Sequence, residues 1–331
     1  MNGAEMKRNC RTTVVIPNYN GIQYLENCLD SLYAGTYLPE IIVVDNGSAD
    51  AGLALLKEKY GGRENLCVVE LSENTGFSNA VNVGIEKADT EFVFLLNNDT
   101  TVDAFCVEEL EKVMDTSSEI FSAGAKMINM KEPEKLDSAG DFYSAFGWAF
   151  SRGKDKPAAK YDKSDRIFAA CAGAAIYRKA LFEKVGLFDV AHFAYLEDMD
   201  VGYRANIWGY RNVFAPKAVV MHAGSAVSGS RHNAFKVDLS ARNSIYLIYK
   251  NMPLLQVLIN IPFLLLGYGI KTLFFIKKGL GMTYLKGVAK GFKLSFSGEG
   301  RRKKVPFRFK NLKNYLFIQL ELWFGMVRRF F

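Results

Sequence analysis

The sequence predicts a mixed α/β protein with a mostly parallel central sheet and helices on both faces. Short runs rich in β-branched residues alternate with helical segments throughout the first half of the chain, which is typical of βα units. Two predicted strands end in clusters of Asn, Asp, Gly and Ser, and open sheets bind ligands at such carboxyl ends. After residue 251 the pattern changes to long apolar and basic segments, which predict a helical appendage.

The predicted strands and helices alternate up to residue 127. The strands are Thr12 to Pro17, Glu40 to Asp45, Leu66 to Leu71, Glu91 to Asn97 and Ile120 to Met127. The helices are expected near Gln23 to Tyr33, Ala51 to Tyr60, Phe77 to Lys87, Ala104 to Met114 and, further on, Glu197 to Trp208. Residues 129–166 show little periodicity and are expected to form loops beside a cleft.

The chain is predicted to divide near residue 251. Residues 1–251 are expected to form a catalytic domain, and residues 252–331 a basic, aromatic, helical region. Residues 251–331 contain 15 Lys and Arg residues against Glu299 and Glu321, a net charge of +13. The rest of the chain has 27 basic and 33 acidic residues, a net charge of −6. This asymmetry predicts an anionic membrane surface as partner, and no recognisable motif supports nucleic acid.

The segment Leu254 to Ile276 is largely apolar and about as long as a membrane-spanning helix. Gln256, Asn260, Pro262 and Lys271 interrupt it. Together with the basic stretches that follow, these interruptions favour a helix lying in the membrane interface over one that crosses the membrane. A buried core helix is the alternative.

The beginning of the chain and the cysteines indicate a cytosolic environment. Met1 to Arg11 is polar, without the apolar stretch and cleavage site of a secretory signal. The five cysteines are scattered singly, without a C-x-x-C pair, which argues against a disulfide framework or a zinc cluster. We expect reduced thiols without a catalytic role.

Six short motifs occur in a definite order along the chain. They are Val15-Ile16-Pro17-Asn18-Tyr19-Asn20, Val44-Asp45-Asn46-Gly47-Ser48, Asn74-Thr75-Gly76-Phe77-Ser78-Asn79, Asn97-Asn98-Asp99, Glu197-Asp198-Met199-Asp200 and Val220-Met221-His222. Over roughly residues 12–251 they resemble the inverting nucleotide-sugar glycosyltransferases of family 2, which have the GT-A fold. Bacterial rhamnosyltransferase-type members are the most similar.

This resemblance implies a metal-dependent enzyme that moves one hexosyl or deoxyhexosyl unit. The expected donor is a nucleotide-diphosphate sugar, with dTDP-L-rhamnose as the specific suggestion. The expected acceptor is a hydroxyl of a lipid-linked or polysaccharide glycan in cell-surface synthesis, at the cytoplasmic face of the cell membrane. An oligomer is left open.

By resemblance, Asp99 and His222 bind the metal, Mg²⁺ or Mn²⁺. Asp99 stands where the family places the last acid of its D-x-D motif, whereas the first position here is Asn97. One carboxylate holds such a hard cation only with further oxygen or nitrogen ligands, which makes His222 the expected second ligand. Without the resemblance, a lone histidine after an apolar strand is more often structural.

The resemblance assigns Asp198 as the general base that deprotonates the acceptor hydroxyl. Glu197 and Asp198 open a helix, where the dipole favours carboxylates while neighbouring acids raise each other's proton affinity. The alternative is a solvated or capping cluster at a helix start.

The remaining site assignments concern the donor and its diphosphate. The donor-binding residues are expected to be Pro17, Asn18, Tyr19, Asp45, Asn74, Gly76, Asn79, Asn97 and Asn98. Further diphosphate or acceptor contacts are expected from Glu197, Trp148, Arg231 and Arg242, since arginine suits phosphate through its forked guanidinium. Turn chemistry at Asp45 and helix capping at residues 74–79 are the structural alternatives.

Two other classes of function are the alternatives. Asn97 in place of an acid favours a catalytically impaired nucleotide-sugar-binding scaffold or partner subunit, because a fold does not guarantee activity. A Rossmann oxidoreductase is disfavoured because no G-x-G-x-x-G follows the first strand.

Overall fold

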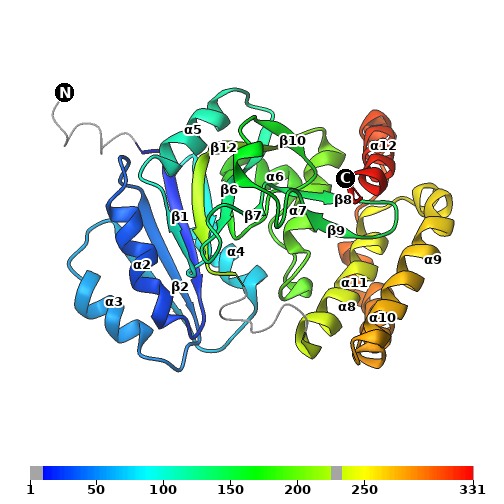
Figure 1. Ribbon diagram of the computed structural model, residues 1–331, viewed down its shortest axis with the longest axis horizontal. Coiled ribbons are helices and arrows are strands. Elements are labelled where there is room, and N and C mark those ends of the chain that lie inside the picture. The colour runs from blue at the N-terminus through cyan, green and yellow to red at the C-terminus, as the bar shows by residue number, and fades with distance from the viewer. Residues whose placement is uncertain (1–9, 225–232, 331) are drawn as a thin grey trace.

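The computed structural model describes residues 10–224 and 233–330 (Figure 1). Within these residues ten strands form one sheet, in the order β10-β12-β6-β11-β4-β1-β2-β3, with β5 and β7 paired to β12 and β6. The strands are β1 (Thr12–Asn18), β2 (Glu40–Asn46), β3 (Leu66–Leu71), β4 (Phe92–Leu96), β5 (Thr100–Val102), β6 (Ile120–Asn129), β7 (Leu136–Ser138), β10 (Asp165–Ile167), β11 (Ala174–Arg178) and β12 (Arg211–His222). A separate two-stranded ribbon contains β8 (Asp141–Tyr143) and β9 (Ala149–Ser151).

The strand order places a topological switch between β1 and β4. The chain runs outward through β1, β2 and β3, which pair in parallel, and then returns to add β4 in parallel on the other side of β1. The connections that leave β1 and β4 run to opposite sides, and in such sheets a crevice opens at the carboxyl ends of the two strands. Asn18 ends β1 and Asn97 follows β4, so the polar motifs meet at this crevice.

The predicted sheet with helices on both faces is confirmed, because alternate residues of the central strands point to opposite layers. Val14 and Ile16 belong to a core cluster under α2 (Ile22–Tyr33), α3 (Gly52–Tyr60) and α5 (Cys106–Asp115). Val15 belongs to the opposite cluster, under α4 (Phe77–Lys87), α6 (Phe182–Val185) and α7 (Glu197–Trp208). The sheet is not wholly parallel, since β11 lies antiparallel between β4 and β6.

The stretch predicted as loops, residues 129–166, contains several short strands. Within it, β7 pairs with β6, β8 pairs with β9, and β10 begins at Asp165 to pair with β12. Each of these strands has three residues, which is too short for an alternating pattern to be recognised in the sequence. Their position beside the sheet edge supplies one wall of the cleft described below.

Helices that follow the sheet pack against α7 and the β8–β9 ribbon, at the right of Figure 1. They are α8 (Ala234–Asn251), α9 (Leu254–Lys277), α10 (Gly281–Phe296), α11 (Gly298–Lys303) and α12 (Leu312–Arg328). Tyr203 and Leu247 share a hydrophobic core with Leu264, Ile318 and Leu322. Packing is therefore continuous across residue 251, where the sequence suggested a boundary.

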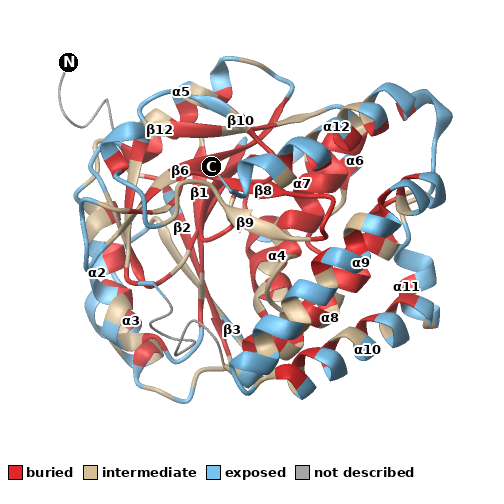
Figure 2. Ribbon diagram, turned by 45° about the vertical axis from the view of Figure 1, so that its right-hand side comes forward, coloured by how far each residue is buried: buried red, intermediate tan, exposed pale blue. Residues whose placement is uncertain are grey.

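Among the described helices, α9 alone is long and apolar enough to cross a membrane. Its inward face nevertheless makes polar contacts along the body of the protein. Gln256 Oε1 accepts a hydrogen bond of 2.6 Å from the Tyr203 hydroxyl, and Asn260 exchanges two bonds of 2.9 Å with Gln319. Figure 2 shows exposed residues on the outer side of the same helix.

Gly267 and Gly269 of α9 provide a matched test of this packing. A Cβ on Gly267 would lie 2.3 Å from the Phe146 carbonyl oxygen, whereas a Cβ on Gly269 meets no atom within 4 Å. We expect Gly267→Ala to lower the free energy of unfolding by about 1–3 kcal/mol, because the backbones must separate. Gly269→Ala should raise it by roughly 0.5–1 kcal/mol through helix propensity. Denaturant unfolding would measure both, and equal effects would show that α9 does not pack on the domain.

Candidate active site

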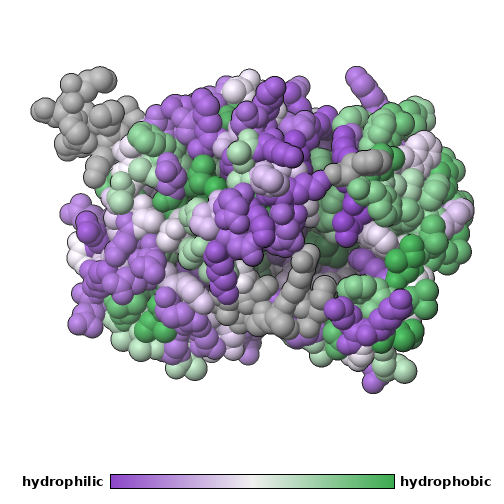
Figure 3. All heavy atoms as spheres, viewed as in Figure 1, coloured by the Kyte–Doolittle hydropathy of each residue, from purple (hydrophilic) through white to green (hydrophobic). Residues whose placement is uncertain are grey.

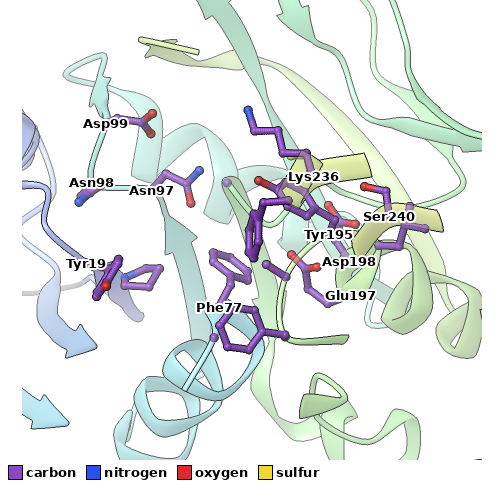
Figure 4. Close-up of a pocket in the computed structure, with 18 of the residues that line it drawn as sticks. Tyr19, Phe77, Asn97, Asn98, Asp99, Tyr195, Glu197, Asp198, Lys236 and Ser240 are labelled. Atoms are coloured by element: carbon purple, nitrogen blue, oxygen red, sulfur yellow. The ribbon is translucent and has the colours of Figure 1, made fainter. Parts of the chain in front are cut away.

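A cleft of about 1120 Å³ lies at the switch point between β1 and β4 (Figure 4). Its lining includes many of the predicted site residues, namely Pro17, Asn18, Tyr19, Asn74, Gly76, Asn97, Asn98, Asp99, Glu197, Asp198 and His222. Figure 4 shows Asp99 and Asp198 on opposite sides of this space. Residues from strand ends, from the start of α7 and from the start of α8 therefore face one cavity.

A buried chain of hydrogen bonds joins the ends of β1, β2 and β4. Asn98 Nδ2 donates to Asn18 Oδ1 at 2.7 Å, and Asn18 Nδ2 donates to Asp45 Oδ1 at 2.9 Å. The other Asp45 oxygen accepts from the Ser48 backbone N–H at 3.0 Å. Asp45 is buried and does not line the cleft, while Asn18 and Asn98 do. Asp45 thus orients the asparagines that face the cavity.

The segment before α4 is held by side-chain amides. Asn74 Oδ1 accepts bonds from the Gly76 backbone N–H at 3.0 Å and from Asn46 Nδ2 at 3.1 Å. Gly76 has a φ of 86°, and a Cβ there would lie 2.6 Å from Phe193, so only glycine fits. Asn79 donates to Thr75 Oγ1 at 2.9 Å and does not line the cleft.

Asp99 and His222 lie side by side, as two ligands of one ion would. His222 Nε2 is 3.4 Å from Asp99 Oδ1, and His222 Nδ1 is 2.7 Å from Asp137 Oδ2. The second contact fixes the imidazole ring in the way that carboxylates orient metal-binding histidines. An oxygen and a nitrogen ligand on one side of an open cleft suit Mn²⁺ or Mg²⁺, with positions left for phosphate oxygens or water.

The electrostatics of this group favour positive charge. Burial opposes protonation of His222, but hydrogen bonds to Asp137 and Asp99 outweigh it and raise the pKa of His222 to about 9. Burial would likewise raise the pKa of Asp137, but His222 and Lys154 lower it to about 2. The same field would attract a divalent cation in place of the proton. Asp137 was missed by the sequence reasoning, because it lies in the segment that lacks periodicity.

Glu197 and Asp198 occupy the opposite wall. Asp198 accepts hydrogen bonds from the Met199 N–H at 2.7 Å and the Ala172 N–H at 3.4 Å. Burial raises the pKa of Asp198, although these bonds oppose the shift. Glu197 is buried, and its Oε2 has no hydrogen-bond partner among the described residues. Burial and, second, the nearby charge of Asp198 raise the pKa of Glu197 well above its ordinary value. A carboxylate with raised proton affinity is suited to general base catalysis.

A third carboxylate, Asp141, was not predicted from the sequence and lies close to Asp198. Single ligand atoms of Asp141, Cys171 and Asp198 all lie within 4.8 Å of one another. Burial and, to a smaller extent, the nearby charge of Asp198 together raise the pKa of Asp141 to about 7. Burial also keeps the Cys171 thiol protonated, by raising its pKa well above the ordinary value. The group is better suited to holding protons than to binding a metal.

The loop that leads into α7 is strained and clamped. Phe193, Tyr195 and Leu196 all have φ between 62° and 69°, a region that costs non-glycine residues free energy. Asn243 of α8 donates to the carbonyls of His192, Ala194 and Tyr195 at 2.9, 2.9 and 2.7 Å. The amide geometry of Asn243 therefore sets the position of the α7 N-terminus.

Of the residues expected to contact diphosphate or acceptor, Arg242 and Trp148 do not line the cleft. Arg242 donates to the carbonyls of Ala191 and His192 at 2.7 and 2.9 Å, so it holds the same strained loop from α8. Trp148 donates to the Gly267 carbonyl at 3.1 Å and packs under α9. Arg231 lies outside the described residues.

The chain shares its mixed, mostly parallel sheet with GT-A glycosyltransferases. The chain belongs to that class through one family: the model described as "Glycosyl transferase family 2" matches residues 13–186, more than half of the 331 residues. The family resemblance and the fold class expected from the sequence are therefore confirmed.

Individual relatives agree with this family. An N-acetylglucosaminyl-diphospho-decaprenol L-rhamnosyltransferase of Mycobacterium tuberculosis is 26% identical over 265 residues, which cover 70% of this chain and 84% of the relative. The glycosyltransferase GlyA of Streptococcus pneumoniae is 34% identical over 124 residues, 37% of this chain, and the match spans only 18% of GlyA.

Solved structures share the fold. The mannosyltransferase PcManGT from Pyrobaculum calidifontis, solved with GDP-Man and Mn²⁺, has a TM-score of 0.53 at 15% identity, covering 97% of this chain and 87% of its own. S. aureus TarS 1-349, solved with UDP-GlcNAc, has a TM-score of 0.54 at 17% identity, covering 96% and 85%. Both matches extend through the C-terminal helices.

The buried Asp141 makes a prediction about pH. Its pKa is higher in the folded chain, about 7, than the ordinary value of 3.8, so the folded state binds the extra proton between these values. Stability from this group is present below pH 3.8 and is lost as pH rises to 7. We expect Asp141→Asn to gain stability over the wild type from pH 5 to pH 8, on the order of 2 kcal/mol.

Urea unfolding at the two pH values would measure this difference. Asp89→Asn, which changes an exposed aspartate, is the matched control and should track the wild type. An Asp141→Asn variant that is destabilised equally at both pH values would contradict the assignment of a buried, proton-holding carboxyl.

Proposed function

We propose that the chain is an inverting, metal-dependent glycosyltransferase that uses a nucleotide-diphosphate sugar. The observation that carries the proposal is the arrangement of Asp99, His222 and Asp137 on one side of a single cleft and Asp198 on the other. The first group can bind a cation that would neutralise the negative charge of the leaving diphosphate. The second can take a proton from an acceptor, so the two chemical needs of transfer are met across one space.

The nucleotide end of the donor is proposed to lie against Pro17, Asn18, Tyr19 and Asn98. These residues line the cleft at the carboxyl ends of β1 and β4, where α/β sheets bind ligands. Asn18 is held at both ends of its amide by Asp45 and Asn98, which leaves it fixed before a ligand arrives. Such preorganisation lowers the entropy lost on binding.

In the transfer step, the Asp198 carboxylate removes the proton of the acceptor hydroxyl as that oxygen attacks the anomeric carbon. The bond from the anomeric carbon to the diphosphate breaks on the opposite side, which inverts the configuration and leaves a nucleoside diphosphate. A bound Mg²⁺ or Mn²⁺, held by Asp99 and His222, supplies positive charge for that diphosphate. The clamp of Asn243 on the preceding loop holds the start of α7, the helix that carries Asp198.

The donor sugar and acceptor are proposed from the relatives. The mycobacterial relative is named for transfer of L-rhamnose to a diphospho-decaprenol carrier, which supports dTDP-L-rhamnose and a lipid-linked or polysaccharide acceptor in cell-surface glycan synthesis. UDP-GlcNAc and GDP-Man, bound by the structural neighbours, are the other donors to include in any panel. A binding scaffold without turnover is the second candidate, since Asn97 supplies an amide where the family has an acid.

Two substitutions separate the roles of the cleft walls. We expect Asp99→Ala to abolish the Mn²⁺-dependent rise in melting temperature caused by the correct donor, because a ligand stabilises only the state it binds. Asp198→Asn should keep that rise but lower kcat by roughly 10²–10⁴, the usual contribution of a general base. Asp89→Asn should change neither quantity.

Donor binding that persists without turnover in the wild type, on every acceptor tried, would favour the scaffold. Retention of the donor's anomeric configuration in the product would exclude inversion at a single displacement, and would contradict the role given to Asp198. Product configuration can be read by NMR from a single turnover.

We also propose that the chain lies on the cytoplasmic face of a membrane, with α9 in the plane of the interface. The support is that the polar residues and Gly267 of α9 contact the body of the protein through the inner face of the helix. The exposed outer face of α9 is apolar. Exposed apolar residues of α9, α10 and α12 gather on one side of the molecule, at the right of Figure 3. Lysines and arginines of the same region would meet anionic headgroups.

Vesicle flotation tests this orientation. Leu265 and Leu266 are 71% and 54% exposed on α9, and we expect changing both to Gln to weaken binding to anionic vesicles roughly tenfold or more. Phe105→Gln, at the exposed residue just before α5, is the control. High salt should release the wild-type protein in part, because the basic contribution is screened. Binding that resists both salt and carbonate extraction would instead indicate a spanning helix.

A further inference from the structure

A second, smaller cavity lies away from the catalytic cleft, at the far end of α7. It has a volume of about 220 Å³, and its lining residues are Lys184, Val185, Arg204, Ile207, Trp208, Lys303, Lys304, Val305, Pro306, Arg308 and Asn311. At about 30 Å³ for each water molecule, this space accommodates an anionic group with its nearest waters. The cavity is formed by α6, α7, α11 and the segment that leads into α12.

The charges around the cavity are of one sign. Five lining residues are cationic and none is acidic. Arg204 is neutralised by Asp200 at 2.8 Å, and Lys303 lies 3.9 Å from Asp189. Within residues 10–224 and 233–330, neither Lys184, Lys304 nor Arg308 forms an ion pair. Three cations that converge without counter-charges repel one another, so an anion between them would be stabilising.

A buried neutral donor points to the same ligand. Asn311 is only 7% exposed, lines the cavity, and has no hydrogen-bond partner for its side-chain Nδ2 in the part of the chain that the structure describes. A buried donor left unpaired costs free energy comparable to a lost hydrogen bond. An oxyanion in the cavity would accept this bond and also meet the surrounding cations.

The cavity is preformed rather than assembled from mobile side chains alone. The Val305 N–H donates to the Lys250 carbonyl at 2.8 Å, which fastens the segment after α11 to α8. The Arg308 guanidinium lies over the Trp208 ring, 5.0 Å from its centre, and this cation–π contact holds the side chain against another residue of the cavity lining. Phe307 and Phe309 are 52% and 77% exposed beside it.

We propose that this cavity is a phosphate-binding site, distinct from the donor cleft. Its ligand is a phosphate group, bound by Lys304 and Arg308 as cations and by Asn311 as a neutral donor. The chemistry fits two sources, the phosphate of an anionic lipid headgroup and free inorganic phosphate. The exposed phenylalanines beside the cavity favour the lipid, because they would enter the interface next to the headgroup.

The test uses the full-length protein and two double variants. Lys304→Gln with Arg308→Gln removes two cavity cations, whereas Lys293→Gln with Lys313→Gln removes the same charge from exposed positions outside the cavity. The first measurement is the melting temperature in potassium phosphate against potassium chloride of equal ionic strength. We expect a saturable rise with phosphate in the wild type and the control, and an affinity at least about tenfold weaker in the cavity variant.

The second measurement is flotation with phosphatidylglycerol vesicles and with phosphatidylcholine vesicles. A tenfold loss of phosphatidylglycerol binding in the cavity variant, absent from the control, assigns the site to a lipid headgroup. Loss of phosphate stabilisation with unchanged vesicle binding assigns it to free phosphate. Equal behaviour of the two variants in both assays would overturn the proposal, as phosphate binding would then reside in the donor cleft or nowhere.

Asn311→Asp provides an independent check, because it keeps the size of the side chain and turns the unpaired donor side into a carboxylate. We expect this variant to lose phosphate stabilisation while its melting temperature in chloride equals or exceeds that of the wild type, because the new carboxylate faces the same cations. Unchanged phosphate stabilisation in Asn311→Asp would contradict the part given to this residue.

Discussion

The buried ion pairs beneath the strained loop that leads into α7 are the interaction on which the rest of the structure depends. Lys250 Nζ lies 2.7 Å from Asp189 Oδ2 and 2.9 Å from Asp200 Oδ2, and Arg204 reaches the same Asp200 oxygen at 2.8 Å. Burial alone would raise the pKa of Asp200, but Arg204 and Lys250 hold it far below its usual range. Removing one partner would leave a buried charge unpaired, which typically costs about 3–5 kcal/mol.

This cluster couples elements that are distant in the sequence. Asp189 precedes the strained loop, Asp200 and Arg204 belong to α7, and Lys250 belongs to α8. The position of Glu197 and Asp198 therefore depends on α8, and through the shared core of Leu247, Leu264 and Leu322 also on α9 and α12. The helices after residue 251 support the active site as well as presenting an apolar face. Their packing joins these helices to the rest of the protein through a shared hydrophobic core.

The sequence predicted the parts of the fold and site that depend on local pattern. Helices α4 and α7 begin and end at the residues expected, and the strand ends bring Asn18 and Asp99 to one cleft because parallel strands share an edge. Asp137 and Asp141 were not predicted, since they lie on three-residue strands without periodicity. Arg242 was expected to contact diphosphate or acceptor, but in the folded chain its guanidinium donates hydrogen bonds to backbone carbonyls. Long-range partners of this kind leave no signal in a single sequence.

The left-handed conformations of Tyr195 and Leu196 set a limit on how this protein could be made more heat-resistant. Glycine at either position would relieve backbone strain, yet it would also give the chain before Glu197 more freedom. Relief of backbone strain is useful for raising stability only where the strained conformation does not position a functional residue. Here the strain fixes the start of α7, so laboratory selection for thermal resistance should avoid this loop, and selection for activity should preserve it.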